Sequence, residues 1–169
     1  MILKLSEIES LMHEPSASSP ILFFEASEAP YGVFSSYSMH AITLDDGVWP
    51  SVEHAFQARK FPPDCDLVER IRLAPDPGYA CLLGRSREYP LRADWETVKR
   101  DIMAELLWAK FTQHADLAEL LLATGEAEIV KHSPFDTEWS DGGDGRGQNW
   151  MGRLIMVVRE KLRESGQRE

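Results

Sequence analysis

Residues 94–111, DWETVKRDIMAELLWAKF, carry the longest helical pattern in the chain. Apolar side chains recur there at steps of three or four, as one face of an α-helix requires. Asp94 precedes the first of them, at a position where a short polar side chain commonly caps a helix. We therefore expect one long amphipathic helix that begins after Asp94. Its apolar positions are Trp95, Val98, Ile102, Leu106 and Ala109, with Met103, Leu107 and Phe111 beside them.

Helical patterns also dominate the rest of the chain. Ser51 stands where a helix N-cap is expected, before a run of strong helix formers that reaches Phe61. The Pro75-Asp76-Pro77 segment separates the next two expected helices, because proline interrupts helical hydrogen bonding. The further helices are expected at 51–61, 67–73, 79–83, 117–123 and 150–162.

Strand signals are few and lie near the start of the chain. Ile21–Phe24 is a short apolar run of the kind that forms a buried strand. Ala41–Leu44 and Val48–Trp49 flank Asp45-Asp46-Gly47, and a glycine after aspartate suits the positive φ of a tight hairpin turn. We therefore predict a single α+β domain, mainly helical, with a small N-terminal strand and hairpin element.

The length of 169 residues fits one domain with short appendages. We expect residues 1–20 to form an N-terminal extension, in which a short helix is followed by a Pro/Ser/Ala-rich linker. The domain is expected at 21–165 and a tail at 166–169. No signal peptide is visible, and no uncharged apolar stretch approaches the roughly 18 residues of a membrane span. These features predict a soluble cytoplasmic protein without a membrane partner.

Net charge limits the kind of partner. The chain has 18 basic and 28 acidic side chains, which gives a formal charge of −10. This balance argues against a broad basic surface that binds nucleic acid. It does not exclude a small basic pocket that binds one phosphorylated ligand. Cys65 and Cys81 lie far apart without a CxxC pair, so we expect two free thiols and neither a disulfide framework nor a zinc site.

The helix expected after Pro50 carries the first candidate site. Helical geometry places Glu53, Gln57 and Lys60 on one polar stripe. The stripe fits two interpretations: a solvated face with ordinary ion pairing, or a carboxylate, an amide and an amine that line a pocket. In a pocket, a buried lysine can act as an imine-forming nucleophile. His54 lies off the stripe and is expected to be a packed or surface histidine.

The second candidate is a glycine-rich loop before the last helix. Residues 142–147 contain four glycines, which is costly in chain entropy unless the backbone approaches something closely. An anion-binding loop and a plain flexible loop both fit. The GK[ST] ending of a Walker A loop is missing, and Asp141 and Asp144 offer too few ligands for calcium.

Cationic and aromatic side chains supply further candidates. Arg85 and Arg87 follow the end of an expected helix, where they either hold a phosphate or are simply solvated. Trp139 precedes the glycine loop rather than sitting on an apolar helical face. Its ring is therefore a candidate for stacking on a base or a sugar.

Taken in order, these segments resemble one family. The match runs from about Phe23 to Leu162 and leaves out only the N-terminal segment. It rests on W-P-x-x-E-H-x-F-Q-A-x-K-F followed by W-x-D-G…G-x-x-N-x-x-G, a highly specific combination. The matching stretches are YGVFSSYS, DGVWPSVEHAFQARKF, LLGRS, LRADWETVKRDIM, KFTQHADLAELLLATGEAEIV and WSDGGDGRGQNWMGRLIMVVRE, and they are similar to the NADAR domain.

The resemblance implies a mainly helical, YbiA-like fold and an N-glycosidase activity that needs neither a metal nor a cofactor. The implied substrates are phosphoribosylamino-pyrimidines that are early riboflavin intermediates, or ADP-ribose on guanine in nucleic acid. Both contain a ribose C1 bonded to an exocyclic amine of a nucleobase-like ring. The alternative is a non-catalytic module that binds ADP-ribose or a similar nucleotide. The net charge favours a small-molecule substrate over a nucleic acid.

The family motif also implies the roles of single residues. Lys60, Glu53 and Asp141 are the expected catalytic residues. The expected substrate-binding residues are Phe34, Ser35, Gln57, Arg85, Trp95, Trp139, Gly142 and Asn149. The chain departs from the motif at Ser36, which replaces an asparagine, at Ser140, which replaces a glycine, and at Gln148, which replaces a lysine.

Two mechanisms are open for these residues. In the first, Lys60 attacks C1 and holds the ribose as a Schiff base, while Glu53 or Asp141 moves the protons. In the second, a carboxylate activates a water molecule that attacks C1 directly, as in inverting glycosidases.

Overall fold

The computed structural model describes Ser10 and residues 19–166. The helix and most of the linker expected in the N-terminal extension lie outside the described residues, as do residues 167–169 of the expected tail. In chain order the elements are β1 (Ile21–Phe23), the 3₁₀ helix η1 (Tyr31–Phe34), β2 (Ile42–Leu44), β3 (Gly47–Trp49), α2 (Val52–Ala58), α3 (Asp66–Arg72), α4 (Pro77–Gly84), α5 (Trp95–Gln113), α6 (Ala115–Ala123), β4 (Ile129–Lys131) and α7 (Trp150–Gly166).

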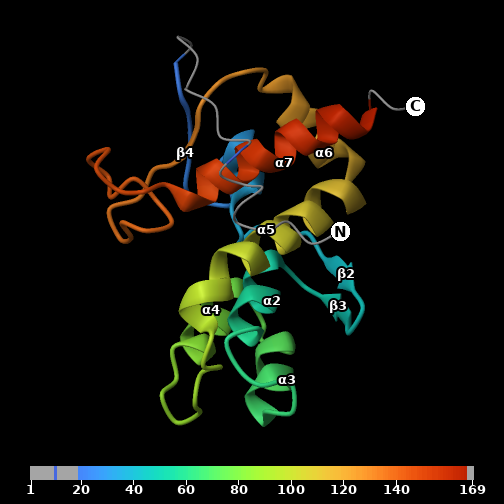
Figure 1. Cartoon of the computed structure of the whole chain (residues 1–169), viewed down its shortest axis with the longest axis vertical. Helices are drawn as coiled ribbons and strands as arrows, with labels where there is room; N and C mark the ends of the chain where they lie inside the picture. Colours follow the sequence, from blue (N-terminus) through green and yellow to red (C-terminus); the bar gives the residue numbers. More distant parts are fainter. Residues whose placement is uncertain (1–9, 11–18, 167–169) are drawn as a thin grey trace.

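The long helix α5 lies at the centre of the molecule (Figure 1). Helices α2, α3 and α4 pack together at one end, and α2 contacts α5. Helices α6 and α7 and strand β4 lie at the other end, where α7 packs on α5. The prediction of a mainly helical α+β fold is confirmed. Within the described residues no helix is long and apolar enough to cross a membrane.

The strands form two separate pairs. Strands β2 and β3 make the expected antiparallel hairpin, with Ile42 opposite Trp49 and Gly47 at a φ of 118°. Strand β1 instead pairs in parallel with β4, Ile21 opposite Ile129. Strand β4 was not predicted from the sequence, because its three residues are too short for a period to show.

The core is built from the apolar faces that the helical spacing predicts. Leu106, Leu107 and Phe111 of α5 are almost fully buried. They pack with apolar side chains of the neighbouring helices and of the hairpin, which include Val52, Leu154 and Trp49. Burial of these side chains is the main favourable contribution to folding.

Two local expectations need correction. Helix α2 ends at Ala58 and Arg59 is its C-cap, so Lys60 lies in the following turn and not on a helical face. Pro62 and Pro63 come directly after this turn and cannot continue the helix. Asp94 does precede α5, but its side chain does not cap the helix; it binds Arg92 through contacts of 2.6 and 2.9 Å. The ion pair therefore outcompetes the cap at this position.

The N-cap at Ser51 is confirmed, because its hydroxyl accepts a hydrogen bond from His54 N. The His54 ring is fully buried. Its Nδ1 lies 2.7 Å from Ser51 Oγ and its Nε2 lies 3.1 Å from Ala74 O. His54 is therefore a packed structural residue that joins α2 to the segment after α3.

Candidate active site

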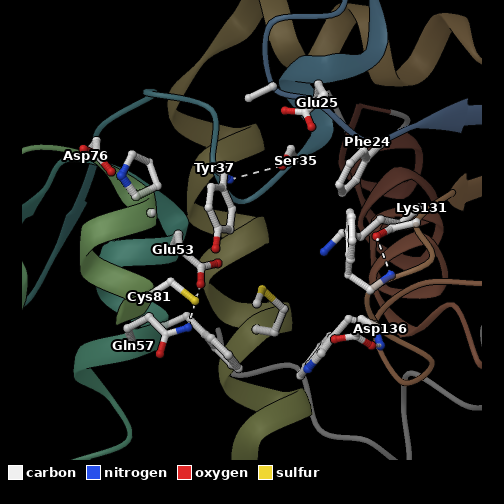
Figure 2. Close-up of a pocket in the computed structure, with 18 of the residues that line it drawn as sticks. Phe24, Glu25, Ser35, Tyr37, Glu53, Gln57, Asp76, Cys81, Lys131 and Asp136 are labelled. Carbon is white, nitrogen blue, oxygen red and sulfur yellow. Dashed lines mark hydrogen bonds between the residues drawn. The ribbon is translucent and has the colours of Figure 1, made fainter. Parts of the chain in front are cut away.

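A cavity of about 810 Å³ lies between helices α2 and α4 on one side and the segments that follow β1 and β4 on the other (Figure 2). Its volume is in the range of small-molecule sites. Of the eleven residues expected to be catalytic or to bind substrate, six line it, namely Ser35, Glu53, Gln57, Lys60, Arg85 and Trp139. Five do not, namely Phe34, Trp95, Asp141, Gly142 and Asn149.

Glu53 is held in one orientation at the wall of the cavity. Its Oε2 accepts a hydrogen bond of 2.7 Å from Ser36 Oγ, and its Oε1 accepts one of 2.6 Å from Gln57 Nε2. The backbone N–H of Glu53 also donates to Ser36 O. Both carboxylate oxygens therefore act as acceptors. The serine at position 36, a departure from the family motif, thus supplies a direct partner of the carboxylate.

Gln57 lies against the end of helix α4. A Cβ atom built on Gly84 would lie 1.9 Å from Gln57 Oε1 and 2.8 Å from its Cδ, so only glycine leaves room for this amide. Gln57 is 4% exposed. Gly84 therefore leaves the space in which the Gln57 amide lies while its Nε2 donates to Glu53.

Lys60 brings a half-buried amine into the cavity. Its Nζ lies 3.5 Å from Gly84 O, 6.0 Å from the centre of the Phe56 ring and 5.9 Å from that of Trp95. Burial lowers the pKa of Lys60, and the negative charge of Glu53 offsets this only in part. The amine is therefore deprotonated more easily than an exposed lysine, which favours nucleophilic chemistry.

The expected aromatic residues occupy different depths. Phe34 is fully buried in the core, where it packs edge-on against Phe23 and Phe111. Trp95 is also buried, and its ring lies 5.0 Å from that of Phe56. Phe34, Trp95 and Trp139 are the three aromatic side chains expected to bind substrate. Of these, only Trp139 lines the cavity. Its ring meets the Phe56 ring edge-on at 5.3 Å.

Arg85 is the C-cap of α4 and lines the cavity. Arg87 does not line it, because its guanidinium donates to the backbone carbonyls of Arg85 and Ser86. Of these two arginines, only Arg85 is therefore placed to contact a ligand in the cavity.

The glycine-rich loop is held together by the side chain of Asp141. Its Oδ1 accepts hydrogen bonds from Ser133 N at 3.2 Å and Gly143 N at 2.8 Å, and its Oδ2 lies 2.7 Å from His132 Nδ1. Burial alone would raise the pKa of Asp141, but these partners outweigh it and hold the pKa below its usual value. Gly142, at a φ of 75°, continues the same turn.

Asn149 closes this loop onto strand β4. Its Nδ2 donates to Ile129 O at 2.9 Å, and its Oδ1 accepts from Lys131 N at 3.0 Å. Its φ of 51° is one that asparagine tolerates better than most residues. Asn149 thus joins the start of α7 to β4 and lies behind the cavity wall.

A buried lysine that was not predicted from the sequence supports the turn at residues 33–38. Lys110 is fully buried and donates hydrogen bonds to Val33 O at 2.5 Å, to Ser35 O at 3.0 Å and to Ser38 Oγ. Burial lowers the pKa of Lys110 to about 7. This side chain anchors the turn that carries Ser35, Ser36 and Tyr37 to the cavity.

Several other cavity residues were not predicted. The Tyr37 hydroxyl points toward Glu53 in Figure 2, and burial together with the Glu53 charge raises the pKa of this phenol. Cys81 of α4 lies beside it. Phe24 and Lys131 come from the opposite wall. Tyr37 directly follows the quoted motif residues 34–36, whereas the other three lie in segments without a local pattern that marks a site.

Comparison with known proteins shows the family and the fold of the chain. The NADAR domain model matches residues 22–163. N-glycosidase YbiA of Escherichia coli (strain K12) is 45% identical over 142 residues, which cover 84% of this chain and 88% of that protein. A protein of Vibrio vulnificus (strain YJ016) named riboflavin biosynthesis protein is 41% identical over 145 residues, 86% of this chain and 39% of its own length.

A solved structure shares the fold. The NMR structure of the E. coli protein YbiA matches with a TM-score of 0.83 and 41% sequence identity, over 94% of this chain and 93% of that chain. The family model and YbiA thus each match more than four-fifths of the sequence, across both walls of the cavity. On these grounds the chain belongs to the NADAR domain family.

Proposed function

We propose that this enzyme, a hydrolase acting on N-glycosyl bonds, cleaves the bond between ribose C1 and the exocyclic amine of a phosphoribosylamino-pyrimidine. The observation that carries the proposal is the convergence of Glu53, Gln57 and Lys60 on one cavity, with the carboxylate held by two hydrogen bonds and the amine half-buried. The relative named N-glycosidase, at 45% identity over most of both chains, supports the reaction class.

Lys60 is the proposed nucleophile. An exocyclic N-glycoside opens to an imine when the ring oxygen takes a proton and the C1–O bond breaks. The neutral Lys60 amine then forms a bond to C1, and the aminopyrimidine leaves with the electron pair of the broken C1–N bond and gains a proton. Water adds to the resulting Lys60 iminium, the Lys60–C1 bond breaks, and the sugar is released as an aldehyde that closes again to a ring. One water molecule is consumed in total.

Glu53 is the proposed proton carrier in these steps. It lines the same cavity as Lys60, and its charge acts on the Lys60 amine. Asp141 was the other carboxylate considered from the sequence. Unlike Glu53, Asp141 does not line the cavity, and its oxygens bind Ser133, Gly143 and His132, so its proposed role is to support that loop.

A phosphorylated small molecule is the proposed substrate for two reasons. The V. vulnificus relative is named a riboflavin biosynthesis protein. Arg85 lines the cavity close enough for its charge to act on Lys60, so this corner offers a positive site for one phosphate. The net charge of −10 adds to this, because flanking phosphates of a nucleic acid would be repelled by the acidic body.

The test offers the enzyme a phosphoribosylamino-pyrimidine and, in parallel, DNA with ADP-ribosylated guanine. Release of ribose phosphate from the first substrate is expected, at a rate well above release of ADP-ribose from the second. The reverse preference would make ADP-ribosylated guanine the substrate. If neither substrate is cleaved and ADP-ribose binds tightly, the protein is a binding module and not an enzyme for these substrates.

The role of Lys60 is tested separately with two variants. Lys60→Ala and Lys60→Arg are both expected to lose activity by at least about 100-fold, since neither offers a nucleophilic amine. Borohydride added during turnover is expected to trap a sugar adduct on wild type and on neither variant. Retained activity in Lys60→Arg without an adduct in wild type would instead support direct attack by water, with Lys60 as a charge only.

A further inference from the structure

One aromatic side chain at the cavity stands out for its exposure. Phe135 is 83% exposed, although it lines the cavity. Its ring lies 6.0 Å from that of Phe24, with a tilt of 37° between them. An exposed phenylalanine gains little from burial in the folded chain, so its presence at a cavity is typical of a ligand contact.

The fold brings the two phenylalanines together from distant parts of the sequence. Phe24 directly follows β1, and Phe135 lies a few residues after β4. The two strands are parallel, so their carboxyl ends meet at the same edge, where His132 N donates to Phe23 O. The pair therefore stands on the only parallel strand pair of the described residues.

The segment that carries Phe135 is also firmly held. Ser140 Oγ donates to Ser133 O at 3.0 Å and to Asp136 O. Gly143, at a φ of 76°, packs so closely on Pro134 that a Cβ atom there would lie 3.1 Å from the proline Cα. The glycine-rich loop therefore acts as a support for residues 133–136. A segment this well supported keeps its exposed ring in place.

Phe24, which backs Phe135, faces the wall of the cavity that carries Glu53. Figure 2 shows Phe24 across the cavity from Glu53, Gln57 and Cys81. When the C1 atom of a substrate lies beside Lys60 and Glu53, the leaving group extends away from these residues along the C1–N bond. The leaving group is the flat part of the molecule, and flat heterocycles stack on aromatic faces.

Building on the function proposed above, we infer that Phe135, backed by Phe24, is the platform that binds the flat face of the heterocyclic leaving group. The sugar and its phosphate lie on the other side of the cavity, near Lys60 and Arg85. Phe135 thereby selects substrates with a planar ring and contributes to binding rather than to the chemical step.

The experiment measures binding of the two halves of the substrate without turnover. Calorimetric titrations use diaminouracil as the heterocycle and ribose phosphate as the sugar half. Phe135→Ala is expected to weaken diaminouracil binding by about 5- to 150-fold, the range of one base–aromatic stack, and to leave ribose phosphate binding unchanged. Phe135→Tyr keeps the ring and is expected to bind as wild type does.

Leu73→Ala is the matched control, because Leu73 is 74% exposed and does not line the cavity. Thermal unfolding of all variants is expected to match wild type, since the deleted side chains are mostly in solvent. Equal diaminouracil affinity in wild type and Phe135→Ala would refute the proposed role of Phe135. The same holds if diaminouracil does not bind to wild type. Because this readout needs no catalysis, a failure to hydrolyse the proposed substrate counts against the proposed function alone.

Discussion

Replacement of Lys110 by methionine tests how the turn at residues 33–38 is anchored. The Lys110 ammonium is fully buried and faces three neutral acceptors, Val33 O, Ser35 O and Ser38 Oγ. No carboxylate has an ion pair with it among the described residues. Lys110→Met keeps most of the side-chain volume and removes both the charge and the donors.

The magnitude follows from the pKa of about 7 that burial gives Lys110. Below pH 7 the folded and the unfolded chain both carry the proton, so Lys110 adds no pH dependence. Between pH 7 and about 10.4 the unfolded chain keeps a proton that the folded chain has lost, and the free energy of unfolding rises with pH. The slope is at most about 1.4 kcal/mol per pH unit, or about 4 kcal/mol from pH 7 to pH 10.

At pH 7 two effects of Lys110→Met oppose each other. The variant avoids burial of an ammonium, which costs roughly 5 kcal/mol when the pKa falls from 10.5 to about 7. It also removes three hydrogen bonds from a charged donor, at roughly 1.5–3 kcal/mol each, although Ser38 N and Ser38 Oγ still donate to the carbonyls of this turn. The two totals are similar. We therefore expect a small stability difference at pH 7 and a clear advantage of wild type at pH 10.

Urea-induced unfolding, followed by tryptophan fluorescence at pH 7, 8, 9 and 10, measures this difference. Lys99→Met in the same helix is the control. Burial lowers the pKa of Lys99, but its hydrogen bonds with Glu138 and Glu96 outweigh this and raise it. The difference between wild type and Lys99→Met is therefore expected to stay flat up to pH 10. A flat difference for Lys110→Met as well would refute the reasoning, because it would mean that the buried amine keeps its proton.

Three further substitutions test how the cavity walls are built. Gly84→Ala places a methyl group on the Gln57 amide and is expected to lower stability by about 1–3 kcal/mol and to reduce kcat/KM, as measured by thermal unfolding and steady-state kinetics. Adding Gln57→Ala removes the clash, so the double variant is expected to be more stable than the sum of the two single effects; strict additivity would contradict the clash. Asn149→Ala removes two hydrogen bonds to β4 at a residue with positive φ, and a loss of about 2–4 kcal/mol is expected in urea unfolding. An unchanged midpoint would show that α7 and β4 stay joined without this side chain.

The helices were predictable because each buries one face, and burial leaves a period in the sequence. Leu106 and Phe111 of α5 show this directly. Strand β4 was not predictable, since its pairing with β1 depends on residues far away in the chain. The end of α2 was misplaced because Ala58, Arg59 and Lys60 are strong helix formers, whereas Pro62 and Pro63 stop the helix early.

The candidate site was predictable where its residues are neighbours in sequence. Glu53 and Gln57 are one turn apart on α2, so their hydrogen bond follows from helical spacing. The position of Asp141 depends instead on how the glycine-rich loop folds back on Ser133, which no local pattern shows. Phe135 carries no sequence signal at all, because an exposed phenylalanine in a loop becomes meaningful only beside a cavity.

The pairing of β1 with β4 has a consequence for the order in which the chain folds during synthesis. Ile21 leaves the ribosome long before its partner Ile129 is made. Helices α2, α3 and α4 rely mainly on one another and on α5, so the wall with Glu53 has its packing partners first. The wall with Phe24 forms only when the last third of the chain has emerged. A nascent chain therefore carries Lys60 and Glu53 for a period in which the opposite wall of the cavity is still missing.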